Sequence, residues 1–287
     1  MEIKYICRHY YNDRLFSQIV RHLLSFFISK ILNITHIHIP YKNNDININF
    51  EKIYKINNLI DETIENHDIN KLMKEKLIYS KPDQNLVGLN NSGKRYFDIN
   101  DIFSDTNINL MRSSYKLNKV SNDYLLSDIN VCLHIRRGDI AKYGNSCGRF
   151  TPINFFIDTI TTIQDILGKK CVFHIYSDSE IKSHIENKNI GSISNIDKCN
   201  IKYHINTDLL TGVNEMIQSD IFIMSIGSNL SHFVGLHTSA IVFIDKNKLT
   251  PCFNNKYNIY WSKYRHFIKD KEHFKKEIYH RFKNTSV

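Results

Sequence analysis

Between residues 130 and 245, short apolar runs alternate regularly with segments of helical pattern. Short apolar runs predict buried strands, and the segments of 3.6-residue periodicity between them predict helices. The predicted strands are Val131–Ile135, Cys171–Tyr176, Ile201–Ile205, Ile221–Met224 and Ala240–Ile244, and the predicted helices are Pro152–Leu167, Ser179–Asn187, Thr211–Gln218 and Asn229–Leu236. This pattern is typical of an α/β fold, so we predict a parallel, doubly wound sheet in the C-terminal half.

The first half opens with a similar pattern. It predicts strands at Ile3–Cys7 and His36–Ile39, the latter stopped by Pro40, with a helix from about Arg14 to Leu32 between them. Residues 41–128 are rich in Asn and Lys, and the predicted helices there are Phe50–Glu65, Ile69–Ile78 and Asn107–Val120. We therefore divide the chain into an N-terminal α/β domain with a helical insertion (1–128), a Rossmann-like domain (129–250) and a basic helical tail (251–287).

The charge of the chain restricts its partners. Its 287 residues carry 38 Lys and Arg against 29 Asp and Glu, a formal net charge of +9. Residues 251–287 alone hold nine Lys and Arg and three Asp and Glu, so +6 of the excess lies in the tail. Such an excess favours a polyanion, a membrane surface or a phosphorylated small molecule as partner.

Targeting signals and cysteines indicate the compartment. The N-terminus lacks the basic and apolar regions of a signal peptide, and the early apolar run Leu23–Leu32 contains Lys30 and is too short to span about 30 Å of hydrocarbon. The cysteines stand singly, without a C-x-x-C pair or zinc spacing, and Cys132 and Cys171 lie in apolar runs. We expect reduced thiols, these two in the core, in a cytoplasmic protein of bacterial or viral type without a membrane span.

The densest functional signal is the motif His134-Ile135-Arg136-Arg137-Gly138-Asp139, at the end of a predicted strand. Ligands of open α/β sheets bind outside the carboxyl ends of the strands, so we expect Arg136 to be an exposed strand-end residue. A guanidinium can grip a diphosphate through parallel charged hydrogen bonds and stabilise charge on a leaving phosphate. The alternative is structural: a surface ion pair between Arg136 and Asp139 and a core histidine at His134.

A second signal lies in Asp220–Phe233, where an apolar strand leads through small and hydroxyl residues into a helix. Free backbone N–H groups and hydroxyls at a helix N-terminus bind phosphate. The same residues are also ordinary N-caps, so this segment alone does not decide between the two interpretations.

Together these residues resemble the fucosyltransferase superfamily of GT-B glycosyltransferases, which includes α1,2-, α1,6- and protein O-fucosyltransferases. Residues 134–139 look like the family's H-x-R-R-x-D motif, Phe173–Asp178 resembles its next strand with a Ser-Asp loop, and Met216–Phe233 resembles its strand, serine and helix segment. The similarity covers roughly Asn130–Asp245. More weakly, Asn12–Gln18 is similar to an N-terminal loop of the α1,2 enzymes.

The resemblance implies a GT-B-like fold of two Rossmann-like domains and roles for particular residues. The catalytic set is Arg136, Arg137 and Asp139; the set that binds the GDP-sugar donor is His134, Arg136, Ser228, Asn229 and Asp208; and the weaker N-terminal loop set is Asn12, Asp13 and Arg14. The chain departs from the family in both loop glycines, at Tyr10 and Asn12, and in the first of the paired serines, at Gly227. It also has Gly212 where several members carry the aspartate that recognises guanine.

The implied reaction is the inverting transfer of L-fucose from GDP-β-L-fucose to a hydroxyl of a glycan acceptor, with neither a cofactor nor a metal. The sequence agrees in lacking a convincing D-x-D, since Asp98-Ile99-Asn100-Asp101 has the wrong spacing. Two alternatives stay open. The donor is another nucleotide sugar, which Gly212 favours, or the chain is a non-catalytic phosphate- or nucleic-acid-binding protein, which the net charge favours.

Overall fold

A computed structural model describes two compact units, residues Met1–Leu117 and Asn118–Val287. The described residues are 5–7, 15–38, 53–55, 59, 61–63, 78–79, 99–102, 104–118, 120, 129–138, 140, 150–178, 190–196, 199–225, 227–244, 267–268 and 270–283. The predicted helix Ser179–Asn187 lies outside them. No described helix has both the length and the apolarity needed to cross a bilayer.

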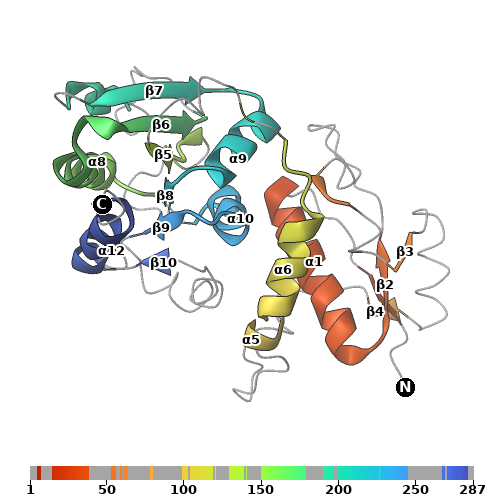
Figure 1. Cartoon of the computed structure of the whole chain (residues 1–287). Coiled ribbons are helices and arrows are strands. Elements are labelled where there is room, and N and C mark those ends of the chain that lie inside the picture. Colours follow the sequence, from red (N-terminus) through yellow and green to blue (C-terminus); the bar gives the residue numbers. More distant parts are fainter. Residues whose placement is uncertain are drawn as a thin grey trace, which may run out of the picture. The chain divides into compact units, whose positions relative to one another are not determined.

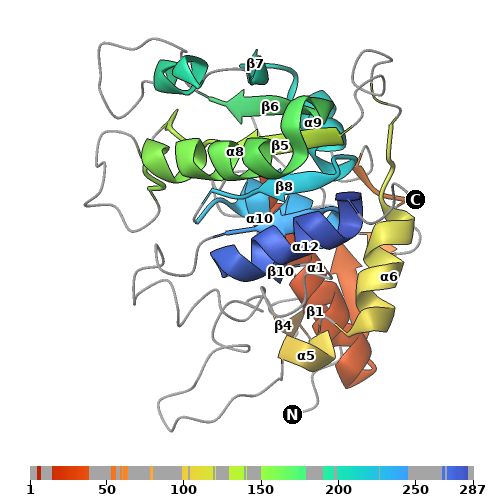
Figure 2. The same cartoon turned by 60° about the vertical axis from the view of Figure 1, so that its left-hand side comes forward.

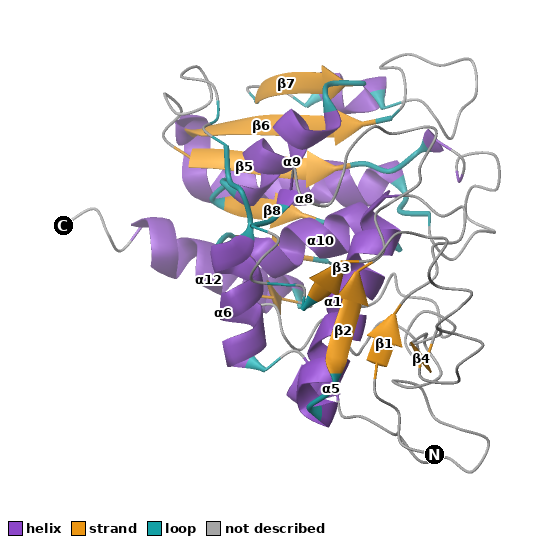
Figure 3. Ribbon diagram, turned by 90° about the vertical axis from the view of Figure 1, so that its right-hand side faces the viewer, coloured by secondary structure: helices purple, strands orange, loops and turns teal. Residues whose placement is uncertain are grey.

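The first unit contains a parallel sheet in the order β3-β2-β1-β4. Its strands are β1 (Tyr5–Cys7), β2 (Thr35–His38), β3 (Glu62–Thr63) and β4 (Ile78–Tyr79), and its helices are α1 (Leu15–Leu32), α5 (Ile99–Ile102) and α6 (Asp105–Ser114). Helix α1 buries Phe16, Ile19, Leu23 and Phe27, whereas Lys30 at its end is exposed. The βαβ opening predicted from the sequence is therefore confirmed, and β1 and β2 lie side by side in Figure 3.

Two predicted helices of this unit are wrong at the residues that form strands. Strand β3 falls within the predicted helix Phe50–Glu65, and β4 begins at the last residue of the predicted helix Ile69–Ile78. The periodicity of a short apolar run does not distinguish a helix from a strand. Pairing with a strand that is distant in the sequence gives these segments their extended conformation. Helix α6 starts close to prediction but ends early, because Tyr115 adopts extended backbone and bridges Tyr54.

The second unit is built on a parallel sheet of six strands in the order β10-β9-β8-β5-β6-β7. The strands are β5 (Ile129–His134), β6 (Cys171–Ser177), β7 (Asn200–Ile205), β8 (Ile221–Ile223), β9 (Ile241–Phe243) and β10 (Phe267–Ile268). Figure 3 shows the arrows of β5, β6, β7 and β8 pointing the same way. The five strands predicted here are confirmed within one or two residues, whereas β10 was not predicted.

Helices cover both faces of this sheet. They are α8 (Ile153–Leu167), α9 (Leu209–Ile217), α10 (Asn229–His237) and α12 (Lys271–Lys283), with 3-10 turns η3 (Gly168–Lys170) and η5 (Gly191–Asn195). Helices α8 and α12 lie together on one face, and α9 and α10 lie on the other (Figure 1, Figure 2). The doubly wound, two-domain GT-B-like arrangement and the domain boundaries at 128 and 250 stay predictions.

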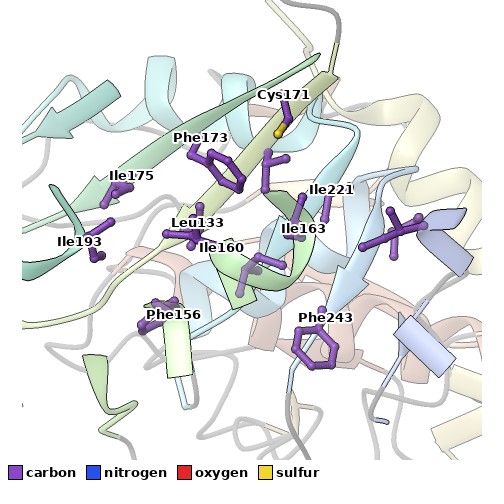
Figure 4. Packing of buried hydrophobic residues seen from close by; sticks show 14 of the residues in the cluster. Leu133, Phe156, Ile160, Ile163, Cys171, Phe173, Ile175, Ile193, Ile221 and Phe243 are labelled. Atoms are coloured by element: carbon purple, nitrogen blue, oxygen red, sulfur yellow. The ribbon is translucent and has the colours of Figure 1, made fainter. Parts of the chain in front are cut away.

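One part of the core of the second unit lies between the sheet and the α8–α12 layer, and another part, which includes Cys132, faces α9. Strand residues such as Leu133 and Phe173 pack against Phe156 and Ile160 of α8 (Figure 4). Phe274 of α12 stacks on Phe243 of β9 with ring centroids 4.2 Å apart. Cys132 and Cys171 are buried free thiols, so their predicted place in the core is confirmed. This packing holds β5 and β8 in place, and the two polar motifs follow these strands.

Candidate functional site

The candidate site lies where the strand order of the second sheet reverses. Strand β5 is followed in the chain by β6 and β7 on one side, and β8, β9 and β10 lie on its other side. Connections leave β5 and β8 in opposite directions, and open α/β sheets bind ligands at the carboxyl ends of two such neighbours. Both polar motifs singled out in the sequence follow these two strands.

The turn after β5 is held by Asp178, which follows β6. Its Oδ1 accepts hydrogen bonds from the backbone N–H groups of Arg137 and Gly138, both at 2.9 Å. Gly138 has a φ of +20°, and a Cβ added there would lie 2.1 Å from Asp178 Oδ2. Glycine is therefore required, because a side chain would both strain the backbone and displace the carboxylate that orients the two amides.

Arg136 is buried at the centre of the site. Its side chain is 7% exposed, and Nη1 donates to Gly227 O at 2.9 Å. Its backbone N–H donates to Ser225 Oγ, also at 2.9 Å. Our expectation that Arg136 is an exposed strand-end residue is therefore wrong. The carbonyls and hydroxyls that follow β8 enclose it, and they come from the strand paired beside its own.

Arg137 is more deeply buried, with 1% of its side chain exposed. Its guanidinium lies over the Phe150 ring at 4.6 Å, and Nη1 donates to Arg136 O. Among the described residues, nothing accepts a hydrogen bond from its Nε or Nη2. Burial lowers the pKa of Arg137 to about 10, against the opposing charge of Asp178, so it stays cationic at neutral pH. A buried cation with free N–H groups is costly unless an anion meets it.

His134, the last residue of β5, contacts the start of α10. Its Nδ1 lies 2.6 Å from Ser231 Oγ and 3.4 Å from Ser228 Oγ. Ser228 is the N-cap of α10, and its hydroxyl oxygen accepts from Ser231 N. Burial, together with the charge of Arg136, lowers the pKa of His134 to about 4, although Asp178 opposes the shift. The imidazole is therefore neutral at physiological pH.

Four predicted site residues, His134, Arg136, Arg137 and Ser228, are thus brought together. Asn229 is the first residue of α10, next to them in the chain. Asp208 instead caps α9, where its carboxylate accepts from Thr211 N and Oγ1; the bond from the Thr211 amide lowers its pKa. The remaining predicted residues, Asp139, Asn12, Asp13 and Arg14, lie outside the described residues.

Sequence reasoning missed three residues of the site: Asp178, Ser225 and Ser231. All three stand in segments that carry the family resemblance, but residue type did not separate them from ordinary turn and helix residues. Ser225 Oγ donates to His134 O at 2.6 Å while accepting from Arg136 N, so it joins the ends of β5 and β8. Ser225 can make these bonds only because β5 and β8 are paired, and the sequence does not show that pairing.

A second polar network joins side chains of β6, β7 and α9. Tyr176 Oη donates to Glu215 Oε2 at 2.6 Å, and the Tyr176 ring stacks on His204. His204 Nε2 lies 3.0 Å from His174 Nδ1. Burial lowers the pKa of His174 to about 3, and it lowers that of His204 against the charge of Glu215. Because a buried polar group is costly without its hydrogen-bond partner, such a network favours a single set of side-chain positions.

This network also borders Gly212, on the first turns of α9. A Cβ at Gly212 would lie 3.3 Å from Tyr176 Cδ1 and 3.4 Å from Thr207 Oγ1. The contact is tight, so a larger side chain would require Tyr176 to shift. As for metals, the described part of the chain contains no group of three or more His, Cys, Asp or Glu that could hold an ion.

Comparisons with known proteins give likenesses in structure alone. No family model matches the sequence, and no curated protein matches it. Crystal structures of POFUT1 are similar: the complex with GDP-fucose at 11% identity and a TM-score of 0.43, covering 84% of this chain and 95% of that one. The complex with GDP has 12% identity and a TM-score of 0.48, and the match covers 83% of this chain and 95% of that one. The apo form has 12% identity and a TM-score of 0.45, and the match covers 82% and 95% of the two chains. With TM-scores this low, the likenesses carry no weight in assigning a function.

Proposed function

We propose that this chain is an inverting glycosyltransferase that transfers L-fucose from GDP-β-L-fucose to a hydroxyl of a glycan acceptor. The observation that carries the proposal is the pair of adjacent buried arginines at the reversal of the strand order, beside the N-terminus of α10. Two guanidinium groups at that position suit a diphosphate, and the motif that contains them resembles the fucosyltransferase motif.

The charge balance of the site supports an anionic ligand. Asp178 is a carboxylate beside the two arginines, and its Oδ1 is already engaged by two backbone amides. In the described part of the chain no carboxylate forms an ion pair with Arg137, whose Nε and Nη2 have no acceptor. A diphosphate would offset the cost of burying these charges, and it would also accept from the N-terminal amides of α10.

The residues suggest how transfer would proceed. As the bond between the sugar and the β-phosphate breaks, negative charge grows on the diphosphate, and a preorganised guanidinium stabilises it without reorganisation. Arg136, fixed by Gly227 O and Ser225, has this role in the proposal, with Arg137 supplying a second positive charge. His134 and Ser228 contact the phosphates, and Asn229 and Asp208 belong to the donor site. The proposed mechanism needs no metal.

Other proposed roles rest on the sequence. Asp139 is assigned to catalysis, either as the base that takes the acceptor proton or by orienting an arginine. Asn12, Asp13 and Arg14 are assigned to an N-terminal loop beside the donor. A general base at such a site contributes about 10²–10⁴-fold to the rate. The partners are a nucleotide-sugar donor and a glycan acceptor, and nucleic acid is not expected to bind.

A different nucleotide sugar is the second candidate, and Gly212 favours it. The resembling family places a guanine-binding aspartate at this position, whereas here the tight contact with Tyr176 leaves little room for a carboxylate. Asp208, four residues earlier, already uses Oδ2 to cap α9. If UDP binds and GDP does not, this candidate replaces the first.

Thermal shift measurements with GDP, UDP and a short RNA separate the candidates. We expect GDP to raise the melting temperature and the other two to leave it unchanged. If RNA alone raises it, the chain is a polyanion-binding protein and the enzyme proposal fails. Radiolabelled GDP-fucose on a glycan array then tests transfer and identifies the acceptor.

A variant of Arg136 tests the site itself. Because Arg136 is buried, Arg136→Ala would also cost stability, so Arg136→Lys is the better change: it keeps a cation but loses the planar fork. We expect at least a tenfold loss of GDP affinity, since one charged hydrogen bond is worth about 1.5–3 kcal/mol. Arg281→Lys is the control, because Arg281 Nη1 also donates to a backbone carbonyl, that of Ser239, but on α12. Equal affinity in the two variants would refute the role of Arg136.

A further inference from the structure

Serine hydroxyls surround one nitrogen of His134. Ser231 and Ser228, at the start of α10, both point a hydroxyl at His134 Nδ1, and Ser231 is completely buried. Ser225, which follows β8, donates its backbone N–H to Ser231 Oγ at 3.2 Å. The strand end, the loop after β8 and the helix are thus joined at a single hydroxyl oxygen.

The donors and acceptors around Ser231 Oγ fix the position of the proton in this contact. An amide N–H can only donate, so Ser231 Oγ accepts from Ser225. The Ser231 hydroxyl still has one proton to donate. Of the described residues, His134 Nδ1 is the single acceptor within its reach, at 2.6 Å. Nδ1 therefore accepts.

A ring nitrogen that accepts a hydrogen bond carries no proton. The proton of the neutral imidazole must then lie on Nε2. The burial of His134, which lowers its pKa to about 4, agrees with a neutral ring from pH 5 to 8. None of the described residues accepts a hydrogen bond from Nε2, so this N–H is available to a ligand.

We propose that Ser231 is a positioning residue that locks His134 in the Nε2–H tautomer, so that His134 donates a hydrogen bond to a phosphate oxygen of the ligand. The proposal rests on the proposed function for the ligand and on the hydrogen-bond geometry for the tautomer. A neutral donor locked in this way binds phosphate equally well from pH 5 to 8, whereas an unlocked imidazole alternates between donating and accepting.

The lock also explains why two hydroxyls face one nitrogen. Nδ1 has a single lone pair, and the shorter contact, from Ser231, occupies it. The proton of Ser228, at 3.4 Å, is then left for the ligand. Ser231 thus separates the two roles: one hydroxyl orients the histidine, and the other joins it in binding phosphate.

Side-chain ¹⁵N NMR of the full chain with labelled histidine tests the tautomer directly. We expect His134 to show a proton on Nε2 and none on Nδ1, without titration between pH 5 and 8. In Ser231→Ala the ring should populate both tautomers and its titration should move toward higher pH, because a hydrogen bond to the neutral form is lost. Ser231→Thr, which retains a hydroxyl, should restore the wild-type spectrum.

Affinity provides the second readout. Ser231→Ala should weaken GDP binding about three- to tenfold at pH 7.5, the value of one ordinary hydrogen bond, and should make the binding depend on pH. Ser219→Ala is the control: it also removes a buried hydroxyl, but one that donates to the backbone carbonyl of Met216 and does not contact His134. It should change neither the spectrum nor the affinity.

The outcomes distinguish this proposal from the proposed function. A proton on Nδ1 in the wild-type spectrum overturns the lock even if GDP binds, and this result does not depend on whether a variant folds. A proton on Nε2 with no binding of GDP or any other nucleotide diphosphate refutes the proposed function, and the ligand role of His134 falls with it. Equal loss of affinity in Ser219→Ala and Ser231→Ala would reduce Ser231 to a purely structural residue.

Discussion

Acid should destabilise the first unit through a cluster of buried histidines. The His22 ring of α1 contacts the His36 and His38 rings of β2, with ring centroids 4.8 and 5.0 Å away, and all three residues are at most 1% exposed. Neither ring nitrogen of His36 has a hydrogen-bond partner among the described residues. The nearby charges are Asp61, which accepts from His36 N, and Lys30, which bonds Asp61.

The sign of the effect follows from the pKa values. Burial lowers the pKa of His36 from 6.5 to about 3, with further lowering by His38 and an opposing effect of Asp61, and burial lowers that of His38 to about 4. The unfolded chain therefore takes up protons below pH 6.5 while the folded unit does not. Stability is fully present above pH 6.5 and falls as the pH drops toward these lowered values.

At pH 5 the unfolded histidines are mostly charged, whereas the folded ones are mostly neutral. In the unfolded chain a histidine with a pKa of 6.5 is then protonated and neutral in a ratio of about 30 to 1, whereas the folded residue is hardly protonated. Each of the two residues therefore lowers the free energy of unfolding by about 2 kcal/mol relative to pH 7.5. His36 and His38 together cost about 4 kcal/mol. This is a large part of the 5–15 kcal/mol that stabilises a typical domain.

Amide hydrogen exchange of α1 and β2 in the full chain measures the opening free energy of this unit at pH 7.5 and pH 5. We expect a fall of about 4 kcal/mol in the wild type and about 2 kcal/mol in His36→Phe. Phenylalanine keeps a ring beside Phe26, which lies 5.6 Å away, and does not titrate. His273→Phe, on an exposed position of α12, is the control. If wild type and His36→Phe fall equally, the burial of His36 is not responsible for its share of the acid destabilisation.

Three further predictions concern the second unit. Gly138→Ala should cost about 1–3 kcal/mol in urea unfolding and weaken GDP binding, because its Cβ would displace the Asp178 carboxylate; unchanged binding would refute this account of the turn. Tyr176→Phe should cost about 1–3 kcal/mol in the same assay, because buried Glu215 loses its hydroxyl donor; a loss within error would contradict it. Burial raises the pKa of Cys171 to about 12, so iodoacetamide at pH 8 should modify this thiol only after unfolding, as mass spectrometry can show.

The sequence predicted most of the second sheet because its signals are local. Each strand is an apolar run with clear ends, and each helix has its own periodicity, so β5 to β9 could be located without knowing their neighbours. In the first unit, β3 and β4 are two-residue strands in segments without a clear period. Their extended conformation depends on a partner strand that is distant in the sequence, so the neighbouring residues do not predict it.

The same division holds in the site. The sequence was enough to place His134, Arg136 and Arg137 after a strand and Ser228 at the start of a helix, because strand ends and caps are encoded by neighbouring residues. The tertiary structure was needed to show that Arg136 is buried, that Asp178 holds the turn from 41 residues away and that Ser231 reaches His134 across 97 residues. These contacts arise because the sheet places β6 and β8 on either side of β5, and strand order is a property of the whole fold that no single segment encodes.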